Sequence, residues 1–255
     1  MPQDISGYDV GALLYCPANA HHTVAQAVTA ERLPRPFSLA LCLEDTVRAD
    51  ALAAAEQAVE QTLHDLTDAA RQETFYRPLT FVRVRSPEQL ARLGRAYGKY
   101  RPLLTGFILP KFFIETCGAY CAVIRDLQAD GLDYFYMPVF EAPSMLPLHT
   151  RHAALAEVKA QLDALRECIL NIRVGGNDLC HVFGLRRDPG HTIYDLRPVA
   201  DVLTDLLTTF APDYLVAGPV WEYYNGPGWA EGLAQECALD RLNGFVGKTV
   251  IHPKQ

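Results

Sequence analysis

The chain has 255 residues, of which 49% are apolar and 21% are charged, proportions that are typical of a globular protein with a full hydrophobic core. Its formal net charge is −7 and its lysines and arginines form no dense block, which argues against a nucleic-acid-binding surface. The seven cysteines are an odd number and mostly occur in apolar runs, so reduced thiols are expected rather than a disulfide framework.

Short apolar runs alternate with longer amphipathic segments along the chain, which is the pattern of repeated β–α units. Several of these runs are continuously apolar, as expected for parallel strands that are covered on both faces. The length is close to the roughly 250 residues of a (β/α)8 TIM barrel, and we expect a single domain over residues 1–255. The eight predicted strands span residues 11–16, 38–43, 79–84, 105–109, 134–140, 169–174, 213–218 and 248–252.

Helical segments lie between these strands. Residues 49–71 are rich in alanine, glutamate and glutamine, and residues 149–168 carry leucine and valine at three- and four-residue spacing. Residues 86–89 (SPEQ) predict a helix start, with a serine N-cap, a proline at the first helical position and a capping glutamine. The last predicted element is the eighth strand, and no covering helix follows it. We expect that the chain is trimmed there rather than that another subunit covers the strand.

Polar side chains follow the predicted strands, at the positions where a barrel carries its functional groups. Any one of them has an ordinary structural explanation. Together they form a set of acids and bases that suits a hard cation and a carboxylate-bearing substrate. They are Asn19, Glu44 with Asp45, Arg83 with Arg85, Lys111, Glu141, Asp178, Glu222 and His252.

Short motifs occur at these strand ends: residues 15–17 (YCP), 41–47 (LCLEDTV), 82–85 (VRVR), 108–111 (ILPK), 140–142 (FEA), 176–179 (GNDL) and 244–255 (GFVGKTVIHPKQ). In order and spacing, the chain from about residue 13 onward resembles the aldolase and citrate lyase β-subunit family. That family consists of magnesium-dependent carbon–carbon bond lyases with a TIM-barrel fold and includes the malyl-CoA lyases. Residues 171–179 (NIRVGGNDL) and 218–223 (GPVWEY) are similar to a divergent branch, the lyase-like proteins associated with tellurite-resistance gene clusters.

The resemblance implies a Mg²⁺ site formed by Glu141 and Asp178. Magnesium favours one or two carboxylates, with water and substrate oxygens completing its octahedron. In a retro-aldol or Claisen cleavage, the dication stabilises the negative charge of the enolate. Arg83 matches the family's substrate-binding arginine, and its planar fork suits a carboxylate or an enolate oxygen. Arg85 departs from the family, which usually has asparagine there.

Glu44 and Asp45 are the remaining catalytic candidates, either by orienting Arg83 and metal-bound water or by transferring a proton. Adjacent strand residues point to opposite faces, so at most one of the two faces inward unless the strand has already ended. In several family members an acid from the C-terminal extension of a neighbouring subunit assists. This chain has no such extension, so the general acid or base stays unassigned. Lys111 and His252 are predicted to contact the substrate from the rim of the site.

Three other interpretations stay open. Lys111 could form a Schiff base, as in metal-independent aldolases. His21, His22, His149 and His152 could contribute to a zinc site, which needs three protein ligands and an open position. The barrel could also bind a small molecule or a protein without turnover.

The predicted partner is a carboxylate-bearing small molecule, in particular an acyl-CoA thioester or an oxo acid, and the protein is expected to be a homo-oligomer. The N-terminus lacks a basic segment followed by an apolar run, and no stretch approaches about eighteen consecutive apolar residues. We therefore expect a cytoplasmic protein with neither a secretory signal nor a membrane span.

Overall fold

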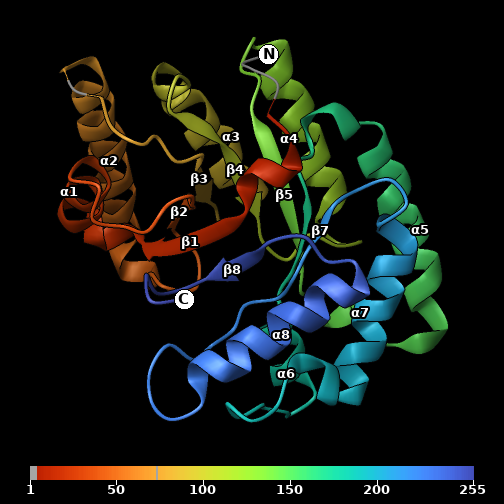
Figure 1. Cartoon of the computed structure of the whole chain (residues 1–255). Helices are drawn as coiled ribbons and strands as arrows, with labels where there is room; N and C mark the ends of the chain where they lie inside the picture. The colour runs from red at the N-terminus through yellow and green to blue at the C-terminus, as the bar shows by residue number, and fades with distance from the viewer. Residues whose placement is uncertain (1–4, 73) are drawn as a thin grey trace.

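The computed structural model describes residues 5–72 and 74–255, in which eight parallel strands form a barrel (Figure 1). The strands follow the order β7-β6-β5-β4-β3-β2-β1-β8, and a bridge between Gly218 and Lys248 joins the two edges. The predicted (β/α)8 fold is therefore confirmed. The strands are β1 (Ala12–Pro17), β2 (Ser38–Cys42), β3 (Thr80–Arg83), β4 (Leu104–Leu109), β5 (Phe135–Phe140), β6 (Ile172–Val174), β7 (Val216–Ala217) and β8 (Lys248–Val250).

Helices surround the barrel and pack on its outer face (Figure 1). The predicted helix over residues 49–71 is α2, whereas the one predicted over residues 149–168 ends at Asp163 and is followed by a separate 3-10 turn. The short helix α6, in the segment between β6 and α7, has no counterpart in the sequence-based prediction. The helices are α1 (His21–Thr29), α2 (Leu52–Gln72), α3 (Pro87–Ala96), α4 (Cys117–Ala129), α5 (Leu148–Asp163), α6 (Gly176–Val182), α7 (Arg197–Phe210) and α8 (Trp229–Asn243).

The start of α3 follows the predicted cap closely. The Ser86 hydroxyl accepts a hydrogen bond from the Gln89 N–H at 3.3 Å, and Pro87 is the first helical residue. The Gln89 side chain accepts from the N–H of Arg85 at 2.7 Å, one residue before the N-cap. The chain therefore turns from β3 into α3 immediately after Arg85, as the sequence predicts.

A small apolar cluster fills the inside of the barrel and includes Leu13, Phe81, Ile108 and Met137. Val10, which directly precedes β1, joins this cluster from a 3-10 turn over Gly7–Val10. Because Val10 lies before its strand, the interior is filled at the amino ends of the strands. A ligand site can therefore open only toward their carboxyl ends, as is usual in this fold.

Strand pairing is uneven around the barrel. The pair β1–β2 has five residues in register, whereas β5–β6 and β6–β7 have two each. The strands predicted over residues 169–174 and 213–218 are correspondingly shorter than expected. Where β7 meets β8, a buried ionic cluster supports the barrel: the Lys248 Nζ lies 2.6 Å from Asp240 Oδ2 and 2.9 Å from Glu236 Oε1, both on α8. A Cβ at Gly218 would come within 2.7 Å of the same Asp240 oxygen, so this position requires glycine.

The segment after β8 forms turns, and no helix follows β8 in the part of the chain that the structure describes. The Gln255 side chain donates to the carbonyl oxygens of Trp221 and Tyr223 at 2.8 and 2.9 Å. These bonds hold the segment against the loop that follows β7. All seven cysteines are free, and none of the described helices combines the length and hydropathy that a membrane span requires.

Candidate active site

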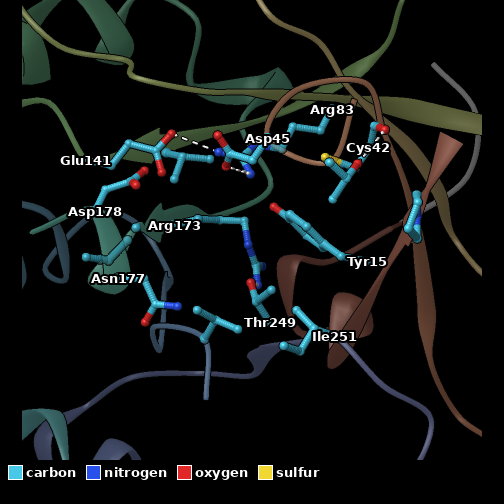
Figure 2. Close-up of a pocket in the computed structure, with 16 residues that line it drawn as sticks. Tyr15, Cys42, Asp45, Arg83, Glu141, Arg173, Asn177, Asp178, Thr249 and Ile251 are labelled. Carbon is cyan, nitrogen blue, oxygen red and sulfur yellow. Dashed lines mark hydrogen bonds and ion pairs between the residues drawn. The ribbon is translucent and has the colours of Figure 1, made fainter. Parts of the chain in front are cut away.

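A cavity of about 270 Å³ opens at the carboxyl ends of the strands (Figure 2). Four of the residues singled out by the sequence line it together, namely Asp45, Arg83, Glu141 and Asp178. They come from the ends of β2, β3, β5 and β6, so residues more than 100 positions apart in the chain meet in one place. The strand ends therefore bring these four residues to one cavity.

Arg83 is the centre of an ionic network at the end of β3. Its side chain is only 8% exposed, and its guanidinium lies 2.9 Å from Asp45, 3.0 Å from Glu44 and 3.0 Å from Glu141. The guanidinium also stacks over the Tyr15 ring at 5.7 Å. Three carboxylates around one buried arginine fix its orientation, because each hydrogen bond to a charged group constrains the planar fork.

Glu141 and Asp178 approach each other from β5 and α6, with both carboxyl groups at the cavity wall (Figure 2). Glu141 is 4% exposed, whereas Asp178 in the first turn of α6 is partly exposed. Burial raises the pKa of Glu141 to about 8, and the nearby Asp178 and Glu44 carboxyl groups add to the rise while Arg83 opposes it. The ionised form of Glu141 is thus disfavoured by its surroundings unless a further positive charge is supplied.

This arrangement fits a divalent cation. Two carboxyl groups face the same cavity, and one of them is buried and resists ionisation. A dication bound by both would stabilise their ionised forms, and the cavity leaves room for the water ligands of the ion. The described residues contain no group of three or more His, Cys, Asp or Glu side chains that could hold a metal. A site with two protein ligands suits magnesium, which keeps several waters, better than it suits zinc.

The backbone around Glu141 is shaped to hold its carboxylate. The N–H of Lys111, which has a positive φ of 50°, donates to Glu141 Oε1 at 3.0 Å. Gly175, which precedes α6, lies so close that a Cβ there would overlap the Glu141 side chain. A left-handed residue other than glycine costs conformational energy, and such residues are concentrated at functional sites.

Glu44 and Asp45 form a pair with opposite pKa shifts. Burial raises the pKa of Glu44, and the adjacent Asp45 adds to that rise. Burial also disfavours ionised Asp45, but the hydrogen bond with Glu44 and the positive charges of Arg83 and Lys111 outweigh it and lower the pKa of Asp45. The two carboxyl groups therefore differ in protonation behaviour, and Asp45 is the one that lines the cavity.

Lys111 points along the rim rather than into the cavity. Its side chain is 58% exposed and its Nζ lies 3.1 Å from Glu44 Oε1. The hydrogen bond and negative charge of Glu44 raise the pKa of Lys111. A lysine that forms a Schiff base needs a lowered pKa so that the neutral amine is available, and the surroundings of Lys111 act in the opposite direction.

Arg85, the departure from the family pattern, does not enter the cavity. Its guanidinium donates to the carbonyl oxygens of Leu43 at 2.6 Å and Glu44 at 3.1 Å, and also to that of Val47. These acceptors belong to the loop that leaves β2. Arg85 thus holds the loop that carries Glu44 and Asp45.

Three of the other strand-end residues lie outside this cavity. The His252 ring stacks on the Tyr224 ring at a centroid distance of 4.4 Å and lines a separate cavity of about 160 Å³. Asn19 is exposed, and Glu222 lies 3.5 Å from the exposed Arg186. None of these three residues lines the main cavity, although Glu222 lines a second cavity together with Asp178.

The two histidines of the zinc alternative whose side chains the structure describes do not lie at the cavity. His149 and His152 are exposed on the first turns of α5, where His152 lies 3.2 Å from Asp205. The side chains of His21 and His22 lie outside the described part of the structure.

Polar residues that the sequence-based interpretation left without a role also line the cavity. Tyr15 and Thr249 extend from β1 and β8, and Asn177 lies in the first turn of α6. Arg173 extends from β6 toward Thr249 (Figure 2). A charged residue inside the apolar run IRV was the signal for Arg173, because a buried strand has no reason to carry an arginine unless it faces a functional interior.

Comparison with known proteins agrees with this architecture. Residues 4–255 match the model of a family described as C–C bond lyases of the TIM-barrel fold. No curated protein matches the chain. Among solved structures, the chain is similar to protein CitE from Mycobacterium tuberculosis, in complex with magnesium, acetoacetate and coenzyme A. The two are 22% identical with a TM-score of 0.64, over 96% of this chain and 77% of that chain.

Two other enzymes share the fold at 10% identity. N-acetylneuraminate lyase from Mycoplasma synoviae has a TM-score of 0.53, over 96% of this chain and 70% of that chain. Fructose-bisphosphate aldolase from Campylobacter jejuni has a TM-score of 0.51, over 97% of this chain and 76% of that chain. At these identities the structural similarities establish the fold.

Proposed function

The chain belongs to the family of C–C bond lyases of the TIM-barrel fold, and from that membership we propose that it is a Mg²⁺-dependent lyase of the retro-aldol or Claisen type. The proposed substrate is a hydroxyacyl thioester or a hydroxy-oxo acid. The bond that breaks joins the hydroxyl-bearing carbon to the carbon next to the acyl group. The similar CitE structure contains magnesium, acetoacetate and coenzyme A, which supports a substrate of this class.

The observation that carries the proposal is the convergence of Glu141 and Asp178 on one cavity that Arg83 also lines. Glu141 and Asp178 would hold the ion, which supplies electrostatic stabilisation of the enolate charge when it is bound. Arg83 contributes a fixed positive charge at the same wall. Because Glu44, Asp45 and Glu141 already orient its guanidinium, it needs no reorganisation during the reaction.

Asp45 is the residue that we assign to the proton transfer. It lines the cavity, and as a carboxylate that is ionised near neutral pH it can accept the proton of the substrate hydroxyl. As that proton leaves, the carbonyl forms, the carbon–carbon bond breaks, and its electron pair moves onto the acyl group. Glu44, which contacts Arg83 and Lys111, is assigned a positioning role.

Lys111 and His252 retain their predicted roles as substrate contacts at the rim. Lys111 presents an exposed ammonium group beside Glu44, and His252 lines a separate cavity of about 160 Å³. The position of Lys111 suits the outer part of a substrate longer than the cavity, such as a thioester.

The test is turnover of a panel of 3-hydroxyacyl-CoA thioesters and 4-hydroxy-2-oxo acids, measured as release of the oxo product with Mg²⁺ and with a chelator. We expect activity only with Mg²⁺ and a loss of about a hundredfold or more in Asp178→Asn, because charge stabilisation of this kind contributes at least that much. Glu157→Gln, at an exposed position on α5, is the matched control. Equal turnover in chelator contradicts the magnesium role, and saturable binding without turnover of any compound identifies a binding barrel instead.

A further inference from the structure

Arg173 is the buried arginine that has no carboxylate partner among the residues that the structure describes. Four arginines are fully buried there: Arg83, Arg151, Arg173 and Arg187. Arg83 pairs with three acids, Arg151 with Asp205 at 2.8 Å and Arg187 with Glu236 at 2.7 Å. Arg173 is 2% exposed and has no such pair within the described ranges.

The groups that do contact Arg173 are neutral. Its guanidinium donates to Thr249 Oγ1 at 2.6 Å and, at a long 3.4 Å, to Asn171 Oδ1, while its Nε–H has no partner in the described residues. Tyr15 also lies nearby, but burial raises the pKa of its phenol, so Tyr15 is neutral at physiological pH. None of these groups balances the positive charge of Arg173.

A buried charge without a counter-charge is unfavourable, so buried arginines are normally paired. Arg173 also lines the cavity, on the wall that joins the Glu141–Asp178 pair to Thr249 (Figure 2). A ligand in that cavity could supply the missing negative charge. The cavity, at about 270 Å³, admits a small acid rather than a bulky group.

We propose that Arg173, supported by Thr249, binds a carboxylate of the substrate at a point separate from the Glu141–Asp178 pair and Arg83. The reacting part of the substrate is therefore a small acid with an additional carboxylate. This inference rests on the proposed lyase function, and it makes Arg173 a specificity-determining residue of the same site. A carboxylate is the better match than a phosphate, because only one guanidinium and one hydroxyl face this point, without the glycine-rich backbone that cradles phosphates.

The experiment compares malate with lactate, two 2-hydroxy acids of which malate carries one additional carboxylate. Calorimetric titration at saturating Mg²⁺ gives the dissociation constant of each. We expect the wild-type protein to bind malate about 10- to 100-fold more tightly than lactate, the range for a hydrogen bond to a charged group. In Arg173→Gln the ratio should fall to about threefold or less, while the affinity for lactate is unchanged.

Two further variants keep the test decisive. Arg173→Lys retains the charge without the planar fork, so it should give an intermediate ratio even if Arg173→Gln does not fold. Arg186→Gln removes an exposed arginine outside the cavity and should keep the wild-type ratio.

The proposal is overturned if the wild-type protein does not prefer malate, if Arg173→Gln and Arg173→Lys both keep the preference, or if inorganic phosphate binds more tightly than malate. Titration with Mg²⁺ alone distinguishes a failure of the inference about Arg173 from a failure of the proposed lyase function. If Arg173→Gln binds Mg²⁺ normally but the malate preference does not depend on this residue, only the inference about Arg173 fails. If the wild-type protein does not bind Mg²⁺, the proposed function fails.

Discussion

Replacing Glu141 by glutamine should stabilise the metal-free protein at neutral and alkaline pH. Burial is the main cause that raises the pKa of Glu141 from the ordinary 4.5 to about 8. Between these two values the unfolded chain has lost a proton that the folded protein keeps, so the free energy of unfolding falls as the pH rises. At 1.36 kcal/mol for each pH unit, the loss reaches on the order of 4 kcal/mol near pH 8.

Glutamine removes this effect with little change in shape. It still offers an oxygen to the Lys111 N–H, and Arg83 keeps its contacts with Glu44 and Asp45. Glu141→Gln should therefore match the wild-type protein near pH 5 and exceed its stability by up to about 4 kcal/mol near pH 8. Urea denaturation in the presence of a chelator, at several pH values, measures the difference. Glu157→Gln, the same chemical change at an exposed position, should show no such trend.

Magnesium should reduce the stability advantage of Glu141→Gln near pH 8. A ligand at a hundred times its dissociation constant stabilises the folded state by about 2.7 kcal/mol, and only the wild-type protein should gain this. A stability difference that does not vary between pH 5 and 8 would refute the reasoning from burial. Equal stabilisation of both proteins by Mg²⁺ would refute Glu141 as a metal ligand.

Three further outcomes are expected. Gly175→Ala should weaken Mg²⁺ binding by about tenfold or more, because its Cβ would overlap the Glu141 side chain. The control is Gly118→Ala on α4, where a Cβ would meet its nearest neighbour at 3.6 Å; this variant should bind Mg²⁺ normally in the same titration. Lys248→Met should lower the free energy of unfolding by about 3–5 kcal/mol, since it leaves the buried Asp240 without its cation, whereas Glu236 keeps its pair with Arg187. A loss below about 1 kcal/mol in urea denaturation would contradict that assignment. Borohydride reduction in the presence of 2-oxo acids should leave Lys111 unmodified because its pKa is raised, and a mass increase at Lys111 would restore the Schiff-base mechanism.

The strand-end rule explains why much of the site could be predicted from the sequence. Asp45, Arg83, Glu141 and Asp178 each follow a recognisable strand, and parallel strands of one barrel necessarily bring their carboxyl ends together. The start of α3 could be predicted for a similar reason, since an N-cap depends on neighbouring residues alone.

What the sequence could not supply was the direction of individual side chains. Arg85 stands two residues from Arg83 on the same rim, yet it binds the carbonyl oxygens of the β2 loop while Arg83 binds carboxylates in the cavity. His252 lies two residues after the end of β8, but its ring stacks on Tyr224 outside the main cavity. These differences depend on contacts between segments far apart in the chain, which residue spacing does not encode. Arg173 was missed because its proposed role depends on its having no acid partner among the described residues, which residue spacing does not reveal.

The uneven backbone pairing of the barrel places the two candidate metal ligands in regions of different rigidity. Glu141 follows β5, which shares four register pairs with β4, whereas Asp178 follows β6, which shares two with each neighbour. An ion held by both would tie the loosely paired side of the barrel to the firmly paired side. Amide hydrogen exchange should then slow in β6 and β7 when Mg²⁺ is added and stay constant in β2 and β3. Binding of the ion would thus also stabilise the backbone of the weakly paired strands.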